Sequence, residues 1–215
     1  EVTALEQGSN WKIHSRAADG CRKVVTAKQV LNAAGAAAGH IALMANLHFP
    51  IFPVPLIMNV TSRTQPTVPH LIQHAGKQLS LKQVRDGNFL IGGGWPGKFM
   101  KNGGVPDFGS RPMVPLSNSR KNIFIACGVV PAISGLQLLR TWAGVVAITA
   151  DQLPILGEAP EAPGFFTASG GSGFTWGPTL GRLMAELMLG HTQTFDLSAY
   201  SPDRFSHINM FMRGG

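Results

Sequence analysis

The stretch that most constrains how this chain folds is a glycine-rich turn at residues 169–178, Ser-Gly-Gly-Ser-Gly-Phe-Thr-Trp-Gly-Pro. It follows the apolar run Phe165–Ala168, which predicts a short buried strand. Leucine and methionine then recur at helical spacing, so we expect a helix that begins near Pro178 and ends at Gly190. Such a turn offers free backbone N–H groups and the positive end of a helix dipole, and glycine lets a ligand approach the backbone closely. Taken alone, the segment favours an ordinary tight strand–helix connection, and other segments of the chain have to support a binding role.

A second unit of this kind occurs near the start of the chain. The run Gln-Val-Leu-Asn-Ala-Ala-Gly at residues 29–35 precedes an expected helix over residues 36–45, which Gly39 weakens. Before it, residues 2–6, 11–14 and 23–27 have strand character, and Asp19-Gly20 predicts a turn between the last two.

The middle of the chain has a different texture. Five prolines between residues 50 and 69 exclude long helices there. Residues 54–61 predict a strand, and residues 79–84 and 88–92 flank Arg-Asp-Gly as a hairpin would. We expect residues 46–148 to form a predominantly antiparallel sheet with long loops, one of them at 103–118. Residues 130–139 are expected to be helical and residues 140–149 to form a strand.

Composition bounds the function without naming it. The chain has 215 residues, 44% hydrophobic and 13% charged, so it is long and apolar enough for a substantial core. The net charge of +7 suits nucleic acid, an anionic membrane surface, or an acidic cofactor or substrate. The Lys and Arg residues are scattered, however, which argues against nucleic acid. Cys21 and Cys127 are too far apart for a redox motif, so we expect a reducing, cytoplasmic compartment, and a buried core thiol at Cys127. No apolar run is long enough to cross a bilayer.

Two other constellations of residues give weaker signals. His70 and His74 are four residues apart, a spacing that suits zinc on a helix, but Pro69 argues against a helix and no third ligand is near. Ser172 is not in a G-x-S-x-G elbow, so a serine hydrolase is not expected. We predict no metal site.

Four segments, in this order, resemble the C-terminal half of the FAD-dependent amino-acid and amine oxidoreductases, the superfamily of D-amino-acid oxidase, glycine oxidase and sarcosine oxidase. They are Val30–Gly35, Gly87–Gly93, the stretch from Trp142-Ala143-Gly144 to Gly157, and the glycine-rich turn with its helix. The stretch after Trp142 contains Thr-x-Asp-x-x-Pro, as in the opine-oxidase, hydrogen-cyanide-synthase and hydroxyproline-dehydrogenase branch.

The resemblance implies a mixed α/β fold. Residues 1–45 would be part of a Rossmann-like FAD-binding domain, residues 46–148 an antiparallel substrate domain, and residues 149–215 a return to the FAD-binding domain with a C-terminal helix and tail. The G-x-G-x-x-G fingerprint that cradles the pyrophosphate is absent. We therefore expect about half of an FAD enzyme, with a second chain supplying the other half or an incomplete product.

The resemblance also implies the site residues. The cofactor-binding candidates are Val2, Ala33, Ala34, Gly35, Gly144, Val145, Gly170, Gly171, Ser172, Gly173, Phe174 and Thr175. The substrate-binding candidates are Lys82, Gln83, Trp142, Val146 and Trp176. Val146 stands where glycine oxidase and its relatives carry a carboxylate-binding arginine, so the resemblance is as consistent with a bulkier secondary amine or a cyclic imino acid as with a simple α-amino acid. Hydride transfer to a flavin needs mainly orientation, so no catalytic side chain is assigned.

The predicted function is thus FAD-dependent oxidation of a C–N bond in an amino acid, imino acid or opine-like amine, with the electron acceptor undecided. Two alternatives stay open: a non-catalytic fragment or subunit that binds a partner chain through an unpaired sheet edge, and a basic module for anionic ligands.

Overall fold

The structure is a computed structural model that describes residues 1–213, and the chain divides into two compact units. Unit 1 comprises residues 1–53 and the chain from residue 147 onward, and unit 2 comprises Val54–Val146. Two long strands, β5 (Ile51–Arg63) and β11 (Leu138–Thr149), each begin in one unit and end in the other.

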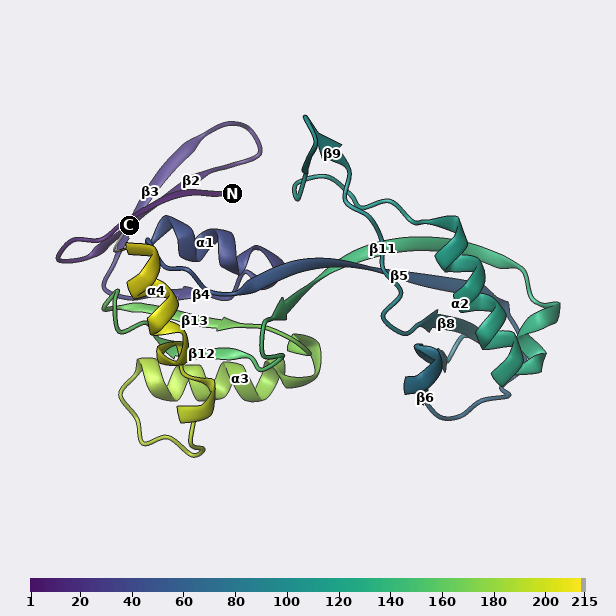
Figure 1. Cartoon of the computed structure of the whole chain (residues 1–215). Helices are drawn as coiled ribbons and strands as arrows, with labels where there is room; N and C mark the ends of the chain where they lie inside the picture. The colour runs from purple at the N-terminus through teal and green to yellow at the C-terminus, as the bar shows by residue number, and fades with distance from the viewer. Residues whose placement is uncertain (214–215) are drawn as a thin grey trace. The chain divides into compact units, whose positions relative to one another are not determined.

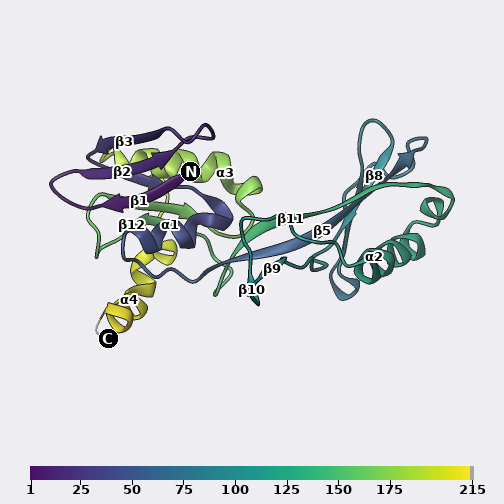
Figure 2. The ribbon, with the colours of Figure 1, turned by 90° about the horizontal axis from the view of Figure 1, so that it is seen from above.

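Unit 1 begins with an antiparallel meander of β1 (Val2–Glu6), β2 (Trp11–Arg16) and β3 (Arg22–Ala27), visible in Figure 2. The predicted turn between β2 and β3 is confirmed. Asp19 accepts a 2.8 Å hydrogen bond from the Cys21 N–H, and Gly20 adopts φ +84°. Such a left-handed position suits glycine because it has no Cβ.

The second sheet of unit 1 has the order β12-β13-β4, formed by β12 (Ile155–Glu158), β13 (Phe165–Ser169) and β4 (Val30–Asn32). β13 is antiparallel to β12 and parallel to β4. The 3₁₀ turn Gly35–Ala37 and helix α1 (Ala38–Met44) follow β4, and α3 (Gly173–Met188) follows β13. Figure 1 shows α1 and α3 on opposite sides of this sheet. The parallel strands β4 and β13 therefore both end at one edge of the sheet and lead into helices there.

Alternation along β13 explains how the sheet is covered on both faces. Phe165 is fully buried in a cluster that includes Ala38 and Ala42 of α1, whereas Phe166 packs with Met184 of α3. Successive side chains of a strand point to opposite faces, so an uninterrupted apolar run is what a doubly covered strand requires. The buried strand predicted at 165–168 is thus confirmed.

Helix α3 corrects one expectation. It begins at Gly173, not near Pro178, so part of the predicted loop is helical and the proline lies inside the helix. A proline there removes the donor that would bond to the Phe174 carbonyl, a small loss because Phe174 is fully exposed and water can serve that oxygen. The predicted C-terminus is confirmed. Gly190 adopts φ +69°, its N–H bonds to the Leu187 carbonyl and the His191 N–H to the Glu186 carbonyl, which is a Schellman motif.

The chain closes unit 1 with two 3₁₀ turns, Ser198–Tyr200 and Pro202–Phe205, and helix α4 (Ser206–Arg213). The tail is not merely laid on the surface. Phe205 belongs to the core cluster, and the fully buried Asn209 accepts a 2.6 Å hydrogen bond from the His48 N–H.

Unit 2 is built on the five-stranded sheet β11-β5-β8-β7-β6, with β6 (Ile72–His74), β7 (Leu79–Gln83) and β8 (Asn88–Gly92). A 3₁₀ turn at Ala75–Lys77 joins β6 to β7. β7 and β8 pair antiparallel, which confirms the predicted hairpin. A small hairpin of β9 (Lys101–Asn102) and β10 (Val105–Pro106) interrupts the region expected to be a loop.

Helix α2 (Leu116–Val129) was missed by the sequence reasoning. Its buried face carries Ser119 and Asn122, while Leu116 and Phe124 are exposed. Polar residues inside and apolar residues outside erase the apolar periodicity that marks a helix. The helix expected at 130–139 is also corrected: only the 3₁₀ turn Pro131–Gly135 forms, and β11 begins at Leu138.

Candidate functional site

Two small-residue turns meet in unit 1 at the carboxyl ends of β4 and β13. In the parallel register Asn32 lies beside Thr167, and the Ser169 hydroxyl donates a 3.1 Å hydrogen bond to the Gly35 carbonyl. The two turns are 134 residues apart in sequence and are joined by this bond. Ligands of α/β sheets bind outside the carboxyl ends of parallel strands, so this edge is the candidate site.

The turn after β4 is held by a residue that sequence reasoning did not select. Asn32 is buried, its amide donates to the Ala38 carbonyl at 2.9 Å, and its side-chain oxygen accepts from the Ala34 N–H at 3.3 Å. Ala33 and Ala34 are exposed, and Gly35 adopts φ +55°. The signal for Asn32 was an amide inside an otherwise apolar strand, because a buried amide must find partners.

The turn after β13 needs glycine for a steric reason. Gly170 adopts φ +129°, and a Cβ there would lie 2.8 Å from the Pro154 Cα. Ser172 follows in the left-handed region at φ +59° and is the N-cap of α3, but its side chain makes no capping hydrogen bond. The Thr175 N–H already donates to the Ser172 carbonyl at 3.0 Å, so the N–H groups of Gly173 and Phe174 are the ones in the first turn of α3 that stay available for an acceptor from outside.

This edge of unit 1 is sterically accessible. A Cβ added at Gly35 or Gly173 would meet nothing within 4 Å. Gly173, Phe174 and Thr175 are exposed, and Trp176 is 52% exposed. Free backbone donors, a helix dipole and open glycines together suit a ligand that brings hydrogen-bond acceptors or negative charge close to the backbone.

The segment Thr149–Pro154 packs directly against Gly170 of the glycine-rich turn. The Thr149 hydroxyl donates to the Leu153 carbonyl at 2.7 Å, and Asp151 accepts from the Leu153 N–H at 3.1 Å. Arg204 pairs with Asp151 at 2.7 Å, and its hydrogen bond holds the pKa of that carboxyl below its usual value. Sequence reasoning noted the Thr-x-Asp-x-x-Pro pattern but found no partner for the aspartate.

A cavity of about 400 Å³ lies beside this support. Its lining is mainly apolar and includes Leu153, Leu156, Trp176, Leu180, Phe195 and Tyr200. Gly171 and Ser172 also line it, so the glycine-rich turn forms one wall of the cavity.

In unit 2 the sheet has two distinct faces. The α2 face is closed: the buried Asn59 accepts hydrogen bonds from the hydroxyls of Ser119 in α2 and Thr141 in β11. Since Thr141 points toward α2, strand alternation places Trp142, Gly144 and Val146 together on the opposite face and Val145 on the α2 side. The structure thus puts one cofactor candidate and two substrate candidates on one face of β11.

Lys82 and Gln83, two substrate-binding candidates, are neighbours on β7 and lie on opposite faces of the sheet. Lys82 alternates with the buried Leu81 and is exposed, on the face away from α2. The Gln83 amide is occupied by backbone groups: its oxygen accepts from the N–H groups of Thr67 and Val68, and its nitrogen donates to the carbonyls of Gln65 and Gly87. Gln83 therefore has a structural task, and its substrate role stays a prediction.

The other residues singled out in the sequence belong to other elements of the fold. Val2 lies on β1, in a different sheet from the two turns, and packs against the core cluster of unit 1. Cys127 is half-buried beside the core of unit 2 instead of fully buried, and Cys21 is exposed. His74 is in a strand, not a helix, and residues 1–213 contain no cluster of three metal-ligating side chains. None of the helices described over that range has the length and apolar character needed to cross a bilayer.

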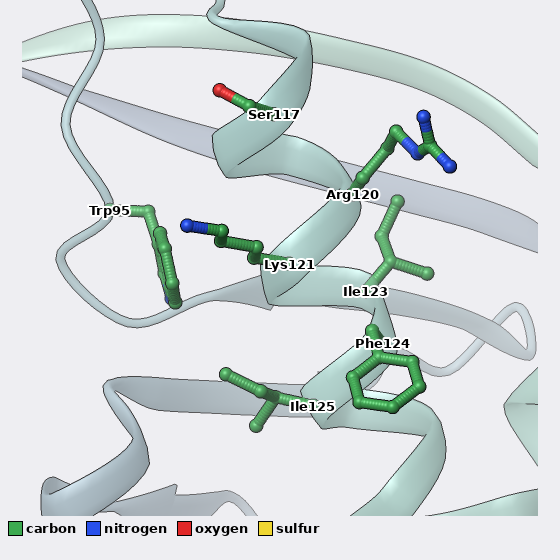
Figure 3. Close-up of a pocket in the computed structure, with 7 residues that line it drawn as sticks. All are labelled: Trp95, Ser117, Arg120, Lys121, Ile123, Phe124 and Ile125. Atoms are coloured by element: carbon green, nitrogen blue, oxygen red, sulfur yellow. The ribbon is translucent and has the colours of Figure 1, made fainter.

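A separate open groove of about 710 Å³ lies in unit 2 along α2. Figure 3 shows Lys121 directed toward Trp95, with Arg120 and Phe124 on the other side of the helix. The groove combines two cations with apolar side chains, and it carries none of the predicted site residues.

Comparison with known proteins defines the class to which this fold and site belong. Residues 1–187 match the family model described as FAD dependent oxidoreductase, known as DAO. The match covers most of the chain, and the chain belongs to this family.

Among individual proteins, the chain is similar to glycine oxidase of Pseudomonas aeruginosa, with 25% identity over 93% of this chain and 56% of that protein. It is also similar to a subunit of the opine oxidase of Agrobacterium tumefaciens, with 25% identity over 84% of this chain and 44% of that protein. The structure of L-proline dehydrogenase from P. horikoshii superposes with a TM-score of 0.79 at 25% identity, over 96% of this chain and 54% of that one. Most of this chain is covered by these matches, but it spans only about half the length of each relative. The mixed α/β fold implied by the resemblance is confirmed.

Proposed function

We propose that this chain is the C-terminal half of an FAD-dependent oxidoreductase that oxidises a C–N bond of an amino acid, imino acid or opine-like secondary amine. The observation that carries the proposal is the hydrogen bond between Ser169 and Gly35, which joins two glycine turns at the carboxyl ends of parallel strands. The uncapped, exposed start of α3 lies at the same edge.

In this proposal unit 1 binds the cofactor. Ala33, Ala34 and Gly35 would line one section of FAD, and Gly170–Thr175 another. When bound, FAD accepts a hydride from the substrate carbon. The N-terminus of α3 would favour negative charge on the reduced ring, because the N–H groups of its first turn carry partial positive charge.

Unit 2 would supply the substrate surface from the sheet face away from α2. Lys82, Trp142 and Val146 lie on that face, with Gly144 between the last two. Lys82 is a point charge on a flexible stem, so it suits a carboxylate less rigidly than an arginine clamp. The Arg140 guanidinium lies 5.5 Å from the Trp142 ring centroid, which holds a cation at this strand. A bulky or cyclic amine carrying a carboxylate is the substrate class that this surface favours.

A second chain carrying G-x-G-x-x-G is the proposed partner. In the described part of the chain β4 is the edge strand of the order β12-β13-β4, so its outer backbone groups have no neighbouring strand. An open edge strand of a sheet is a template for another strand. This edge equally supports the second candidate function, a non-catalytic subunit that only binds such a partner.

FAD titration tests the proposal, with the chain alone and with a polypeptide that carries the fingerprint half. We expect Gly173→Glu to weaken FAD binding about tenfold or more, because it places a carboxylate at the start of α3. Gly181→Glu is the matched control, since it is exposed on the same helix and its Cβ also meets nothing within 4 Å.

Equal losses in both variants would refute the placement of the cofactor. If the chain takes up no FAD either alone or with the partner polypeptide, yet binds that polypeptide, the result would refute the enzyme function and support the non-catalytic subunit.

A further inference from the structure

We propose that the segment Tyr200–Phe205 is a clamp that holds the glycine-rich turn in its binding shape, and that Arg204 and Asp151 are its positioning residues. The inference rests on the proposed function to the extent that Gly170–Thr175 contacts the cofactor. The clamp itself is a property of the chain without cofactor.

The Arg204 guanidinium donates hydrogen bonds to two separate segments of the chain. Arg204 donates through Nε to Asp151 at 2.7 Å and through Nη1 to the carbonyls of Tyr200 at 2.6 Å and Ser201 at 3.0 Å. Through Nη2 it also donates to the carbonyls of Leu153 at 3.2 Å and Pro154 at 3.1 Å. One side chain therefore joins its own segment to both the aspartate and the backbone of the 149–154 turn. Only the five-donor fork of arginine can serve this many acceptors at once.

The second step leads from that turn to the glycines. A Cβ on Gly170 would lie 2.8 Å from the Pro154 Cα, 3.2 Å from the Thr149 Cγ2 and 3.4 Å from the Leu153 carbonyl oxygen. The glycine-rich turn thus rests directly on the backbone that Arg204 grips. Within residues 149–154, the Thr149 hydroxyl donates a hydrogen bond to the Leu153 carbonyl, and the Asp151 carboxylate accepts one from the Leu153 N–H. A shift of residues 153–154 would be passed to Gly170 because no space separates them.

The third step is a second contact of the same segment with the sheet. Pro202 lies against Gly157 of β12, where an added Cβ would be 3.1 Å from the Pro202 Cδ and where the backbone has φ +134°. β12 is the neighbour of β13, whose end leads into the glycine-rich turn. The segment therefore touches the turn's support at Arg204 and its parent sheet at Pro202.

The Arg204–Asp151 pair is well suited to this task. The Arg204 side chain is 19% exposed, whereas Arg182, the arginine of the Arg182–Glu186 pair in α3, is 61% exposed, so the Arg204 guanidinium is the more shielded of the two. The guanidinium also lies 4.5 Å from the Phe205 ring centroid, and Phe205 is a core residue. The charge is thereby fixed to the packed interior of unit 1.

Amide hydrogen exchange on the cofactor-free chain tests the clamp. We expect Asp151→Asn and Arg204→Lys each to raise exchange about tenfold in peptides covering residues 149–154 and 170–173, with little change in the β1–β3 meander. Arg204→Lys keeps the charge but loses the fork, so it should not rescue the protection. Arg182→Gln, which removes the exposed arginine of the Arg182–Glu186 pair in α3, is the matched control and should leave these peptides unchanged.

Two outcomes would overturn the clamp. One is unchanged exchange at 170–173 in both variants, and the other is a uniform rise across unit 1 that matches a loss of global stability. Full protection in Arg204→Lys would reduce the clamp to a simple charge pair and would also overturn it. Because the measurement contains no FAD, the clamp can stand if the chain proves not to bind FAD, and the cofactor proposal can stand if the clamp fails.

Discussion

The glycine-rich edge of unit 1 and the α2 face of unit 2 treat their polar groups in opposite ways. At the start of α3 the residues are exposed, and the N-cap side chain makes no hydrogen bond to the N–H groups of Gly173 and Phe174. In unit 2 every position of the Asn59 amide is used: its oxygen accepts from Ser119 and Thr141, and its nitrogen donates to the Asn122 side chain and the Ile91 carbonyl.

The difference separates polar groups that can serve a ligand from polar groups that hold a shape. A fully satisfied buried network costs much to break and offers nothing to a ligand. Unfilled donors at a helix start contribute little to stability until an acceptor arrives. Substitutions in the two regions should therefore affect different measurements.

The largest effect is expected where the network is cut. Asn59→Leu leaves the hydroxyls of Ser119 and Thr141 and the amide of Asn122 without their buried partner, so we expect the free energy of unfolding to fall by about 3 kcal/mol. Urea denaturation measures it, with the exposed Asn102→Ala as control. A loss no greater than that of the control would mean that the network is not a closed structural element.

The two glycines of one turn give a smaller and sharper contrast. Gly170→Ala forces a Cβ against the Pro154 Cα at φ +129°, and we expect it to cost about 2 kcal/mol. Gly173→Ala meets open space in a helical residue, so stability should stay the same or rise by up to about 1 kcal/mol. Thermal unfolding of the two variants side by side checks this. Equal costs would contradict the division between a packed glycine and an open one.

The smallest effect on stability is expected when the pH is lowered and Asp151 becomes protonated. The hydrogen bond from Arg204 lowers the pKa of Asp151 in the folded chain, so its stabilisation is fully present above the usual aspartate pKa of about 3.9 and is lost as the pH falls below it. Arg204 is the charged partner that faces this carboxylate, and the neighbouring Asp203 accepts from the Ser206 hydroxyl. In Asp151→Asn the stability of the chain should therefore decline less as the pH falls from about 4 to about 2, which urea denaturation followed by circular dichroism at each pH measures. An identical pH profile in both proteins would show that the ionisation of Asp151 does not contribute to the stability of the folded chain.

Much of the secondary structure could be predicted from short stretches of the sequence. The meander, the hairpin at 79–92, the strand at 165–169 and the glycine stop at Gly190 follow from alternation, turn chemistry and helix-end chemistry, which involve only near neighbours in the chain. Helix α2 escaped because its polar side chains face inward to partners on other strands, and no local pattern shows where those partners are. The division into FAD-binding and substrate domains, and the roles of the individual site residues, stay predictions.

By itself, the sequence determined that two glycine turns exist, that each follows a strand and precedes a helix, and that the pyrophosphate fingerprint is absent from these 215 residues. Only the tertiary structure decided that β4 and β13 are parallel neighbours, so that Gly35 and Ser169 meet across 134 residues. It also decided which carboxylate Arg204 holds, 53 residues away. The physical reason is that strand pairing and ion pairing join residues by their distance in space, and the spacing of residue types along the chain carries no record of that distance.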